Sequence, residues 1–310
     1  MKKTFLIILL SSITSIFSQE KKVITQEVEV NSLIKGTLFS PENVTKQTKL
    51  VILIAGSGPT NRNGNQVGTQ NNSLKFLAEG LAQNGIAVFS YDKRIFAQII
   101  NKTFDEKTLS FEDFINDAKD VIAYYKSQKK YSKIIIAGHS EGSLIGMVAA
   151  NGTADGFISL AGPGRPIDEV LSEQIAKNSP TLKEATDKDL AILKEGKTFE
   201  NKNPLLASLF RESVQPYMIS WIKYNPQNEI KKLSIPTLII NGTRDSQVPP
   251  SDAELLHEAN PKSELKIIEN MNHLFKEVTT DDENKKSYAD PKLPVVPELI
   301  DKMTTFIKSI

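Results

Sequence analysis

Runs of apolar residues alternate with amphipathic stretches along most of this chain. The predominantly apolar runs lie at residues 50–55, 86–91, 133–137, 156–160, 236–240 and 265–268. Short apolar runs of this kind are typical of strands that are buried on both faces of a parallel sheet. Helical periodicity is clearest over residues 74–84, which Gly85 ends, and over residues 111–128. The alternation predicts an α/β fold with a mostly parallel central sheet and helices on both faces.

Two segments near the start of this pattern show partial alternation of apolar and polar residues instead. They span residues 23–30 and 33–39, and the polar pair Asn31-Ser32 separates them. Alternation with period two indicates strands that expose one face, and the short polar connection indicates a hairpin. We therefore expect an antiparallel hairpin at one edge of the sheet.

The alternation of strands and helices stops over residues 162–232. This stretch is rich in Glu, Lys, Leu and Ala, contains no convincing strand, and predicts several helices. A helical segment inserted between strands of one sheet forms a cap, so residues 19–161 and 233–310 are expected to form the α/β core. Aromatic residues of the cap fit either the packing of a helix or contact with a substrate: Phe210, Tyr217, Trp221 and Tyr224.

Residues 1–18 have the pattern of a secretory signal peptide. Lys2 and Lys3 precede an apolar stretch over residues 5–17, which is too short to span a bilayer. Ser18 is small enough to precede a cleavage site, so we expect cleavage before Gln19 and an exported protein, periplasmic or secreted, with no stable membrane insertion afterwards. An uncleaved membrane anchor is the alternative interpretation.

The composition narrows the possible chemistry. The 310 residues include no cysteine and three histidines, and 38 basic side chains against 37 acidic ones give a net charge of +1. A near-neutral chain argues against a nucleic-acid partner, because such proteins normally carry a basic surface. The lack of cysteine excludes thiol nucleophiles, disulfides and cysteine-ligated metals. No metal or cofactor motif occurs in the sequence, so we expect no cofactor and no metal.

Residues 138–142 (GHSEG) fit the G-x-S-x-G pattern of a nucleophilic serine. An apolar strand (KIIIA) precedes this motif, and a helix-competent run (SLIGMVAA) follows it. A sharp turn from strand to helix strains the serine backbone and presents its hydroxyl at the carboxyl edge of the sheet, over a helix N-terminus. The alternative is a glycine-rich turn that only lets the helix pack closely on the sheet. The context favours Ser140 as a nucleophile.

The three histidines allow the base to be chosen by elimination. His139 is next to the serine on the turn, where its side chain cannot easily face the Ser140 hydroxyl, and His257 lies within a predicted helix over residues 251–259. His273 follows a strand in a short loop, from which it can reach across the sheet edge. We therefore predict His273 as the base, the alternative being an ordinary loop histidine.

A base of this kind needs a carboxylate to orient it, and Asp245 is the best candidate. It follows the strand over residues 236–240, so it belongs to the same edge of the sheet. Asp252 is the nearest rival, but it opens the following helix and is typical of a helix N-terminal charge or cap. Asp245 has an alternative interpretation as a turn residue. The chain order of serine, aspartate and histidine is the order found in α/β-hydrolases.

With these residues the chain resembles the α/β-hydrolase superfamily over nearly all of residues 20–310. It is most similar to secreted bacterial esterases that have a Gly-Ser-Gly-Pro oxyanion loop, here residues 55–65 (AGSGPTNRNGN). The similarity extends to residues 91–94 (YDKR) and to residues 161–166 (AGPGRP) at the start of the cap.

This resemblance implies an oxyanion hole made by the backbone N–H groups of Ser57 and Glu141, with Gly58 as an alternative donor to Ser57. The chain departs from the family pattern at three places. Residues 55–56 (AG) replace a His-Gly pair, residues 61–63 (NRN) lack the acidic residues often found there, and Ile95 replaces a glycine. We expect the loop at Ile95 to follow a different path.

The sequence thus predicts a cofactor-free serine hydrolase that cleaves small-molecule carboxylic esters, of small or short-acyl type, through an acyl-enzyme on Ser140. A prolyl-type serine aminopeptidase is the first alternative, because such enzymes share this fold, cap and order of residues. A non-catalytic binding protein of the same fold is the second. No feature of the sequence specifies an oligomeric state.

Overall fold

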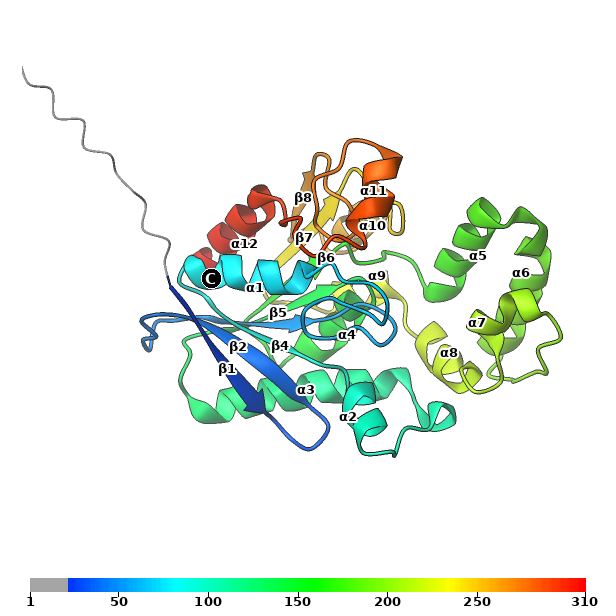
Figure 1. Ribbon diagram of the computed structural model, residues 1–310, viewed down its shortest axis with the longest axis horizontal. Helices are drawn as coiled ribbons and strands as arrows, with labels where there is room; N and C mark the ends of the chain where they lie inside the picture. The colour runs from blue at the N-terminus through cyan, green and yellow to red at the C-terminus, as the bar shows by residue number, and fades with distance from the viewer. Residues whose placement is uncertain (1–21) are drawn as a thin grey trace, which may run out of the picture.

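The computed structural model describes residues 22–310, and these form one α/β unit around a single sheet (Figure 1). The sheet has eight strands in the order β1-β2-β4-β3-β5-β6-β7-β8. The predicted signal peptide lies outside the described residues. Among the described residues, no helix combines the length and the apolar character needed to cross a membrane.

The first strands form the expected hairpin at one edge of the sheet. Strand β1 (Val23–Glu29) pairs with β2 (Lys35–Pro41) in antiparallel register, and β2 pairs in the same sense with β4 (Ala87–Tyr91). The connection is closed by Asn31, whose side-chain oxygen accepts hydrogen bonds from the backbone N–H groups of Leu33 and Ile34.

The remaining strands are parallel, as the apolar runs predict. They are β3 (Leu50–Ile54), β5 (Ile134–His139), β6 (Gly156–Leu160), β7 (Thr237–Gly242) and β8 (Glu264–Ile268). Strands β3, β5, β6 and β7 are buried along their whole length. The predicted fold class is therefore confirmed. Because parallel strands present their carboxyl ends at one edge, the loops after β3, β5, β7 and β8 meet there.

Helices cover both faces of this sheet. One face packs against α1 (Ser73–Gln83) and α12 (Pro297–Ser309). The other face packs against α3 (Phe111–Gln128), α4 (Glu141–Ala150), α9 (Pro226–Lys231) and α10 (Pro250–Ala259). A further short helix, α11 (Asp281–Ser287), follows the loop after β8.

The segment between β6 and β7 consists of helices joined by loops and turns, and it contains no strand. Four of its helices lie together to one side of the sheet in Figure 1: α5 (Ile167–Asn178), α6 (Lys183–Lys194), α7 (Ala207–Phe210) and α8 (Gln215–Ile222). Helix α9 returns to the core, where the side chain of Asn260 donates a hydrogen bond to the carbonyl of Ile230 over 3.2 Å.

A second excursion leaves the core after β4. It contains α2 (Arg94–Ile100) and the 3-10 turn at Glu106–Thr108, neither of which the apolar pattern predicts. None of the side chains of α2 is buried. Strand β4 ends at Tyr91 and the helix begins three residues later, so the chain takes a helical path at Ile95. This excursion contacts the helical segment between β6 and β7, called the cap below, through a hydrogen bond of 2.8 Å from Nε of Arg211 to Glu106.

Candidate active site

Ser140 lies on a strained turn between β5 and α4. Its backbone has φ 54° and ψ −122°, a conformation that L-residues rarely adopt and that clusters at functional sites. The flanking glycines are required by close backbone approach: a Cβ on Gly138 would lie 2.1 Å from the carbonyl oxygen of Gly142, and one on Gly142 would lie 2.4 Å from that of Ile54. The turn therefore has the geometry of a nucleophile elbow.

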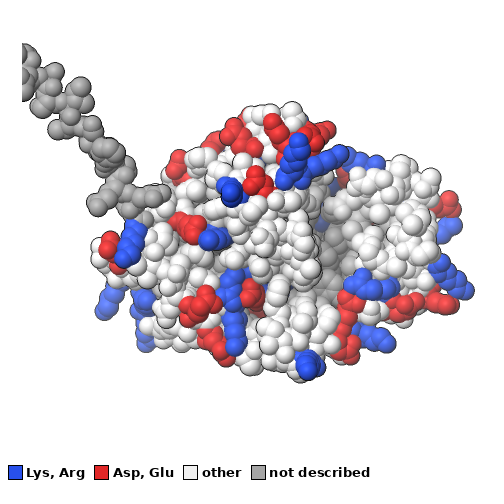
Figure 2. All heavy atoms as spheres, in the orientation of Figure 1, with Lys and Arg blue, Asp and Glu red and all other residues white. Residues whose placement is uncertain are grey.

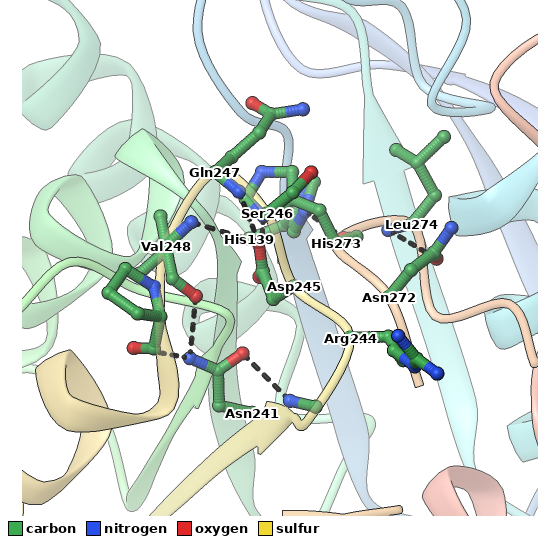
Figure 3. Close-up of polar contacts among 12 residues, drawn as sticks. His139, Asn241, Arg244, Asp245, Ser246, Gln247, Val248, Asn272, His273 and Leu274 are labelled. Atoms are coloured by element: carbon green, nitrogen blue, oxygen red, sulfur yellow. Dashed lines mark hydrogen bonds and ion pairs between the residues drawn. The ribbon is translucent and has the colours of Figure 1, made fainter. Parts of the chain in front are cut away.

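The structure brings Asp245 and His273 into direct contact, as the sequence predicts. The Oδ2 atom of Asp245 lies 2.8 Å from Nδ1 of His273, and both side chains are buried (Figure 3). The other carboxylate oxygen accepts the backbone N–H groups of Gln247 at 2.9 Å and Val248 at 2.8 Å. With both oxygens engaged, the carboxylate has a fixed orientation towards the imidazole ring.

Two buried asparagines hold the loops that carry these side chains. Asn241, at the end of β7, donates to the carbonyls of Val248 at 3.1 Å and Pro249 at 3.2 Å, which closes the loop around Asp245. Asn272 accepts the backbone N–H groups of Leu274 and Lys276, which shapes the loop around His273. Neither asparagine was predicted from the sequence as part of the site. The sequence did contain a sign of this role, because each asparagine lies near the end of a predicted strand. There an asparagine side chain readily forms hydrogen bonds with nearby backbone groups.

His139 makes a structural contact that was likewise not predicted from the sequence. Its Nε2 atom lies 2.9 Å from the carbonyl oxygen of His273, and the two rings are 4.7 Å apart between centroids. Burial, followed by the nearby charges of His273 and Lys93, lowers the pKa of His139 well below its ordinary value. The neutral ring therefore donates to the carbonyl and positions the His273 loop beside the nucleophile turn.

The hydroxyl of Ser140 makes no hydrogen bond to any of residues 22–310, His273 included. Its position next to His139 nevertheless places it beside the His273 loop. Hydrogen bonds between a nucleophile and its base are often long in the absence of substrate and tighten in the complex.

The remaining candidate residues lie apart from this cluster. His257, in α10, has its Nδ1 atom 2.9 Å from the hydroxyl of Ser263. Asp252 lies in the first turn of α10, where its buried carboxylate accepts the backbone N–H of Gly164 and two guanidinium nitrogens of Arg165. Asp252 thus attaches the start of the cap segment to the core and does not touch His273.

The loop after β3 is held close to the nucleophile. The carbonyl oxygen of Ser57 accepts hydrogen bonds from the Thr60 hydroxyl at 2.9 Å and from the Gln66 side chain at 3.0 Å. Farther along the loop, Arg62 forms an ion pair with Asp92, the residue directly after β4, over 2.6 Å. Neither the N–H of Ser57 nor that of Glu141 has an acceptor among the described residues, which leaves both able to bind an oxyanion.

A cavity of about 550 Å³ opens over Ser140, between the sheet edge and the cap helices. Figure 2 shows the surface hollowed between these two parts. Most of its lining is apolar, and it includes Ile95 and Phe104 from the excursion after β4, and Val170 and Leu209 from the cap. Such a cavity binds a mostly apolar small molecule and orients it with a few polar groups.

The aromatic residues of the cap divide between packing and the cavity. Phe210 is fully buried, whereas Tyr217 and Trp221 line the cavity. Trp221 also stacks on Phe111 of α3, with the ring centroids 5.5 Å apart. Tyr224 also packs on Phe111, with the ring centroids 5.2 Å apart, and does not line the cavity. Phe210 and Tyr224 therefore serve in packing, and contact with a substrate stays a prediction for Tyr217 and Trp221.

The carboxylates of the cavity lining are both paired with a basic side chain. Glu141 accepts a hydrogen bond from Lys93 over 2.7 Å, with both side chains buried. Glu106 accepts from Nε of Arg211 over 2.8 Å and also from the Ser213 hydroxyl. The hydrogen bond from Arg211 lowers the pKa of Glu106 below its ordinary value. Within residues 22–310, no cluster of acidic and histidine side chains is suited to hold a metal ion.

Comparison with known proteins gives a matching family and one clear relative. A family model described as "Serine aminopeptidase, S33" matches residues 68–278. Esterase EstD from Thermotoga maritima is 30% identical over 265 residues, which cover 81% of this chain and 60% of EstD. The chain thus matches about three-fifths of the length of that relative.

Solved structures share the fold at low sequence identity. Est1E from Butyrivibrio proteoclasticus superposes with a TM-score of 0.59 at 16% identity and covers 92% of this chain and 99% of its own. The esterase Pf2001 from Pyrococcus furiosus superposes with a TM-score of 0.54 at 15% identity, and the match covers 93% of this chain and 91% of Pf2001. Dienelactone hydrolase from Anabaena variabilis superposes with a TM-score of 0.52 at 15% identity, and the match covers 94% of this chain and 99% of that enzyme. These similarities establish a common α/β-hydrolase fold.

Proposed function

The chain belongs to the serine aminopeptidase, S33, family of α/β-hydrolases, and from this premise we propose that it is a serine hydrolase of carboxylic esters. The observation that carries the proposal is the 2.8 Å contact between Asp245 and His273 beside the strained turn of Ser140. The similarity to esterase EstD supports the ester as the substrate.

In the proposed mechanism Ser140 attacks the substrate carbonyl while Nε2 of His273 takes the proton from its hydroxyl. Asp245 holds the ring in the tautomer that leaves Nε2 free, and stabilises the imidazolium that forms. The tetrahedral intermediate then breaks the bond to the alcohol, which leaves with the proton from His273. Water repeats the cycle on the acyl-enzyme, so an acid is released and Ser140 is restored.

We assign the oxyanion hole to the backbone N–H groups of Ser57 and Glu141. Neither group has an acceptor among residues 22–310, and Glu141 is the first residue of α4, where the helix dipole favours negative charge. The fixed carbonyl of Ser57 holds the loop in place while charge develops on the substrate. Loss of one such donor typically costs about 3 kcal/mol of transition-state stabilisation.

The family description also raises an aminopeptidase as the second candidate. An aminopeptidase must hold the α-ammonium group of its substrate, which calls for an unpaired carboxylate in the cavity. The acidic residues that line the cavity, Glu106 and Glu141, are each paired with a basic side chain. This pairing favours the neutral ester.

We propose that the cap at residues 162–232 selects the substrate. We further propose that the protein is exported after cleavage of residues 1–18 and acts in the periplasm or outside the cell. The support for export is the pair Lys2-Lys3 followed by a short apolar stretch. N-terminal sequencing of the protein purified from its native cells should start at Gln19. A start at Met1 would contradict the proposal.

The test of the function compares p-nitrophenyl esters, from acetate to longer acyl chains, with aminoacyl-naphthylamides. We expect turnover of the esters and loss of that turnover in Ser140→Ala. The cavity volume leaves room for groups larger than acetate, so the series should extend beyond short chains. Turnover of the naphthylamides alone would favour the aminopeptidase, and unchanged ester turnover in Ser140→Ala would remove the proposed nucleophile.

A further inference from the structure

A buried ion pair forms part of the wall of the otherwise apolar cavity. Nζ of Lys93 lies 2.7 Å from Oε1 of Glu141, and the side chains are 4% and 2% exposed. Both residues line the cavity that contains Ser140, and Glu141 follows Ser140 directly in the chain. The pair is therefore within reach of a group bound next to the reacting carbonyl.

Packing alone gives no reason for charges at this place. Removing two charges from water is costly. Replacing a buried ion pair by apolar residues of similar size is often neutral or even stabilising. The neighbours of the pair include Phe114, whose ring centre lies 4.8 Å from Nζ of Lys93. A cavity that only bound hydrocarbon would be lined as well by apolar side chains here.

The pair retains capacity for further hydrogen bonds. An ammonium group has three donors, and Lys93 uses one on Glu141 while a second side of the group faces the Phe114 ring. A carboxylate accepts about four hydrogen bonds. Two side chains beside Glu141 can donate to its carboxylate, Lys93 and the phenol of Tyr217. Burial, and after it the nearby Glu141 carboxylate, raises the pKa of Tyr217 well above its ordinary value. Donor and acceptor capacity therefore remain side by side.

We propose that Lys93 and Glu141 form a subsite that recognises a hydroxyl group on an otherwise apolar ester. The inference rests on the proposed function, because it concerns the substrate of the same cavity. A hydroxyl group accepts from the ammonium and donates to the carboxylate, which no hydrocarbon group does. The pair is neutral as a whole, so a substrate group with a net charge would remain uncompensated in this buried place.

The hydroxyl group can belong to the acyl part or to the alcohol part of the ester, and two series of substrates distinguish these sources. The acyl series is methyl phenylpropanoate, unsubstituted or with an ortho, meta or para hydroxyl group. The alcohol series is phenylethyl acetate with the same four rings. We expect one hydroxylated isomer in one series to exceed its unsubstituted parent about tenfold or more in kcat/KM, since the parent leaves the polar groups unpaired.

Variants test whether the ion pair causes this preference. In Lys93→Met we expect the preference to fall to about twofold or less. Because that change leaves a buried carboxylate unpaired and can prevent folding, the double variant Lys93→Met, Glu141→Leu removes both charges and keeps the backbone N–H of residue 141. Lys302→Met breaks a partly exposed pair with Glu264, far along the chain in α12, and serves as the matched control.

The outcomes separate the subsite from the proposed function. Equal rates for all rings of both series, or an equal loss for all rings in the variants, would overturn the subsite and leave the pair as a support for the Glu141 amide. Calorimetry with the same esters on Ser140→Ala measures binding without turnover. If the wild-type protein cleaves none of the esters while the Kd still depends on the hydroxyl group, the subsite is retained and the esterase is refuted.

Discussion

The edge of the sheet and the cap build opposite walls of one cavity with different kinds of contact. At the sheet edge, backbone N–H groups fix the Asp245 carboxylate, and buried asparagines close the loops around Asp245 and His273. On the cap side, the contacts to the core include pairs of side chains, such as the stacked rings of Trp221 and Phe111, while Gln215 bonds backbone carbonyls within the cap itself.

This difference indicates how the two regions can vary. Contacts to the backbone fix the orientation of a side chain, which suits groups that move protons, because such groups must be held within about 0.5 Å of the productive geometry. Side-chain contacts between helices tolerate exchange for other apolar groups, which suits the selection of a substrate. We therefore expect changes at the sheet edge to alter the rate of reaction, and changes at the cap to alter stability and substrate preference.

The largest effect should come from Asp245→Asn. The amide cannot hold the His273 ring in the required tautomer, so kcat/KM for an ester should fall about 10³- to 10⁴-fold while the fold is kept. Steady-state kinetics and urea unfolding of the same preparation check this. A loss of less than about tenfold would mean that the loop around Asp245 has no special role compared with the cap.

Asp252→Asn provides the contrasting change at the junction of core and cap. Its carboxylate holds Arg165 and the backbone of Gly164, so the free energy of unfolding should fall by about 2–3 kcal/mol. The folded protein should keep kcat/KM within a few-fold of the wild type. A large loss of rate without loss of stability would show that Asp252 belongs functionally with Asp245.

The pH dependence of stability tests the rigid edge through His139. Its folded pKa lies below the ordinary value of 6.5, so below about pH 6.5 the unfolded chain binds a proton that the folded chain does not. Stability should therefore fall as the pH falls, by up to about 1.4 kcal/mol per pH unit from this residue. Urea unfolding from pH 7.5 to pH 5.5 should show a weaker dependence in His139→Gln. Parallel curves for both proteins would contradict a buried, neutral His139.

The smallest effect is expected at the ion pair between Glu106 and Arg211, where the excursion after β4 meets the cap. The Arg211 side chain is 43% exposed, so Arg211→Met should cost less than about 1 kcal/mol of stability. Added salt should reduce the difference from the wild type, because it screens exposed charges. An effect as large as that of Asp252→Asn would mean that both contacts of the cap are equally important.

The sheet edge could be predicted from the sequence because each of its parts depends on a local pattern. A buried strand followed by a polar loop pointed to Asp245 and His273, which the structure brings into contact, and glycines around a serine between strand and helix pointed to Ser140. The geometry of the cavity depends on residues that are distant in sequence. The contact of Lys93 with Glu141 joins positions 48 residues apart, and that of Glu106 with Arg211 joins positions 105 apart. Helix α2 has no buried side chain, so apolar periodicity gave no signal for it.

Covalent labelling with a fluorophosphonate tests the central claim most directly. The reagent reacts with a serine only where a base activates the hydroxyl and an oxyanion hole stabilises the adduct. Mass spectrometry should find one adduct per chain, on the peptide that contains Ser140, with none in Ser140→Ala and a strongly reduced rate in Asp245→Asn. An unlabelled wild-type protein, or an adduct at another residue, would contradict the account of this site.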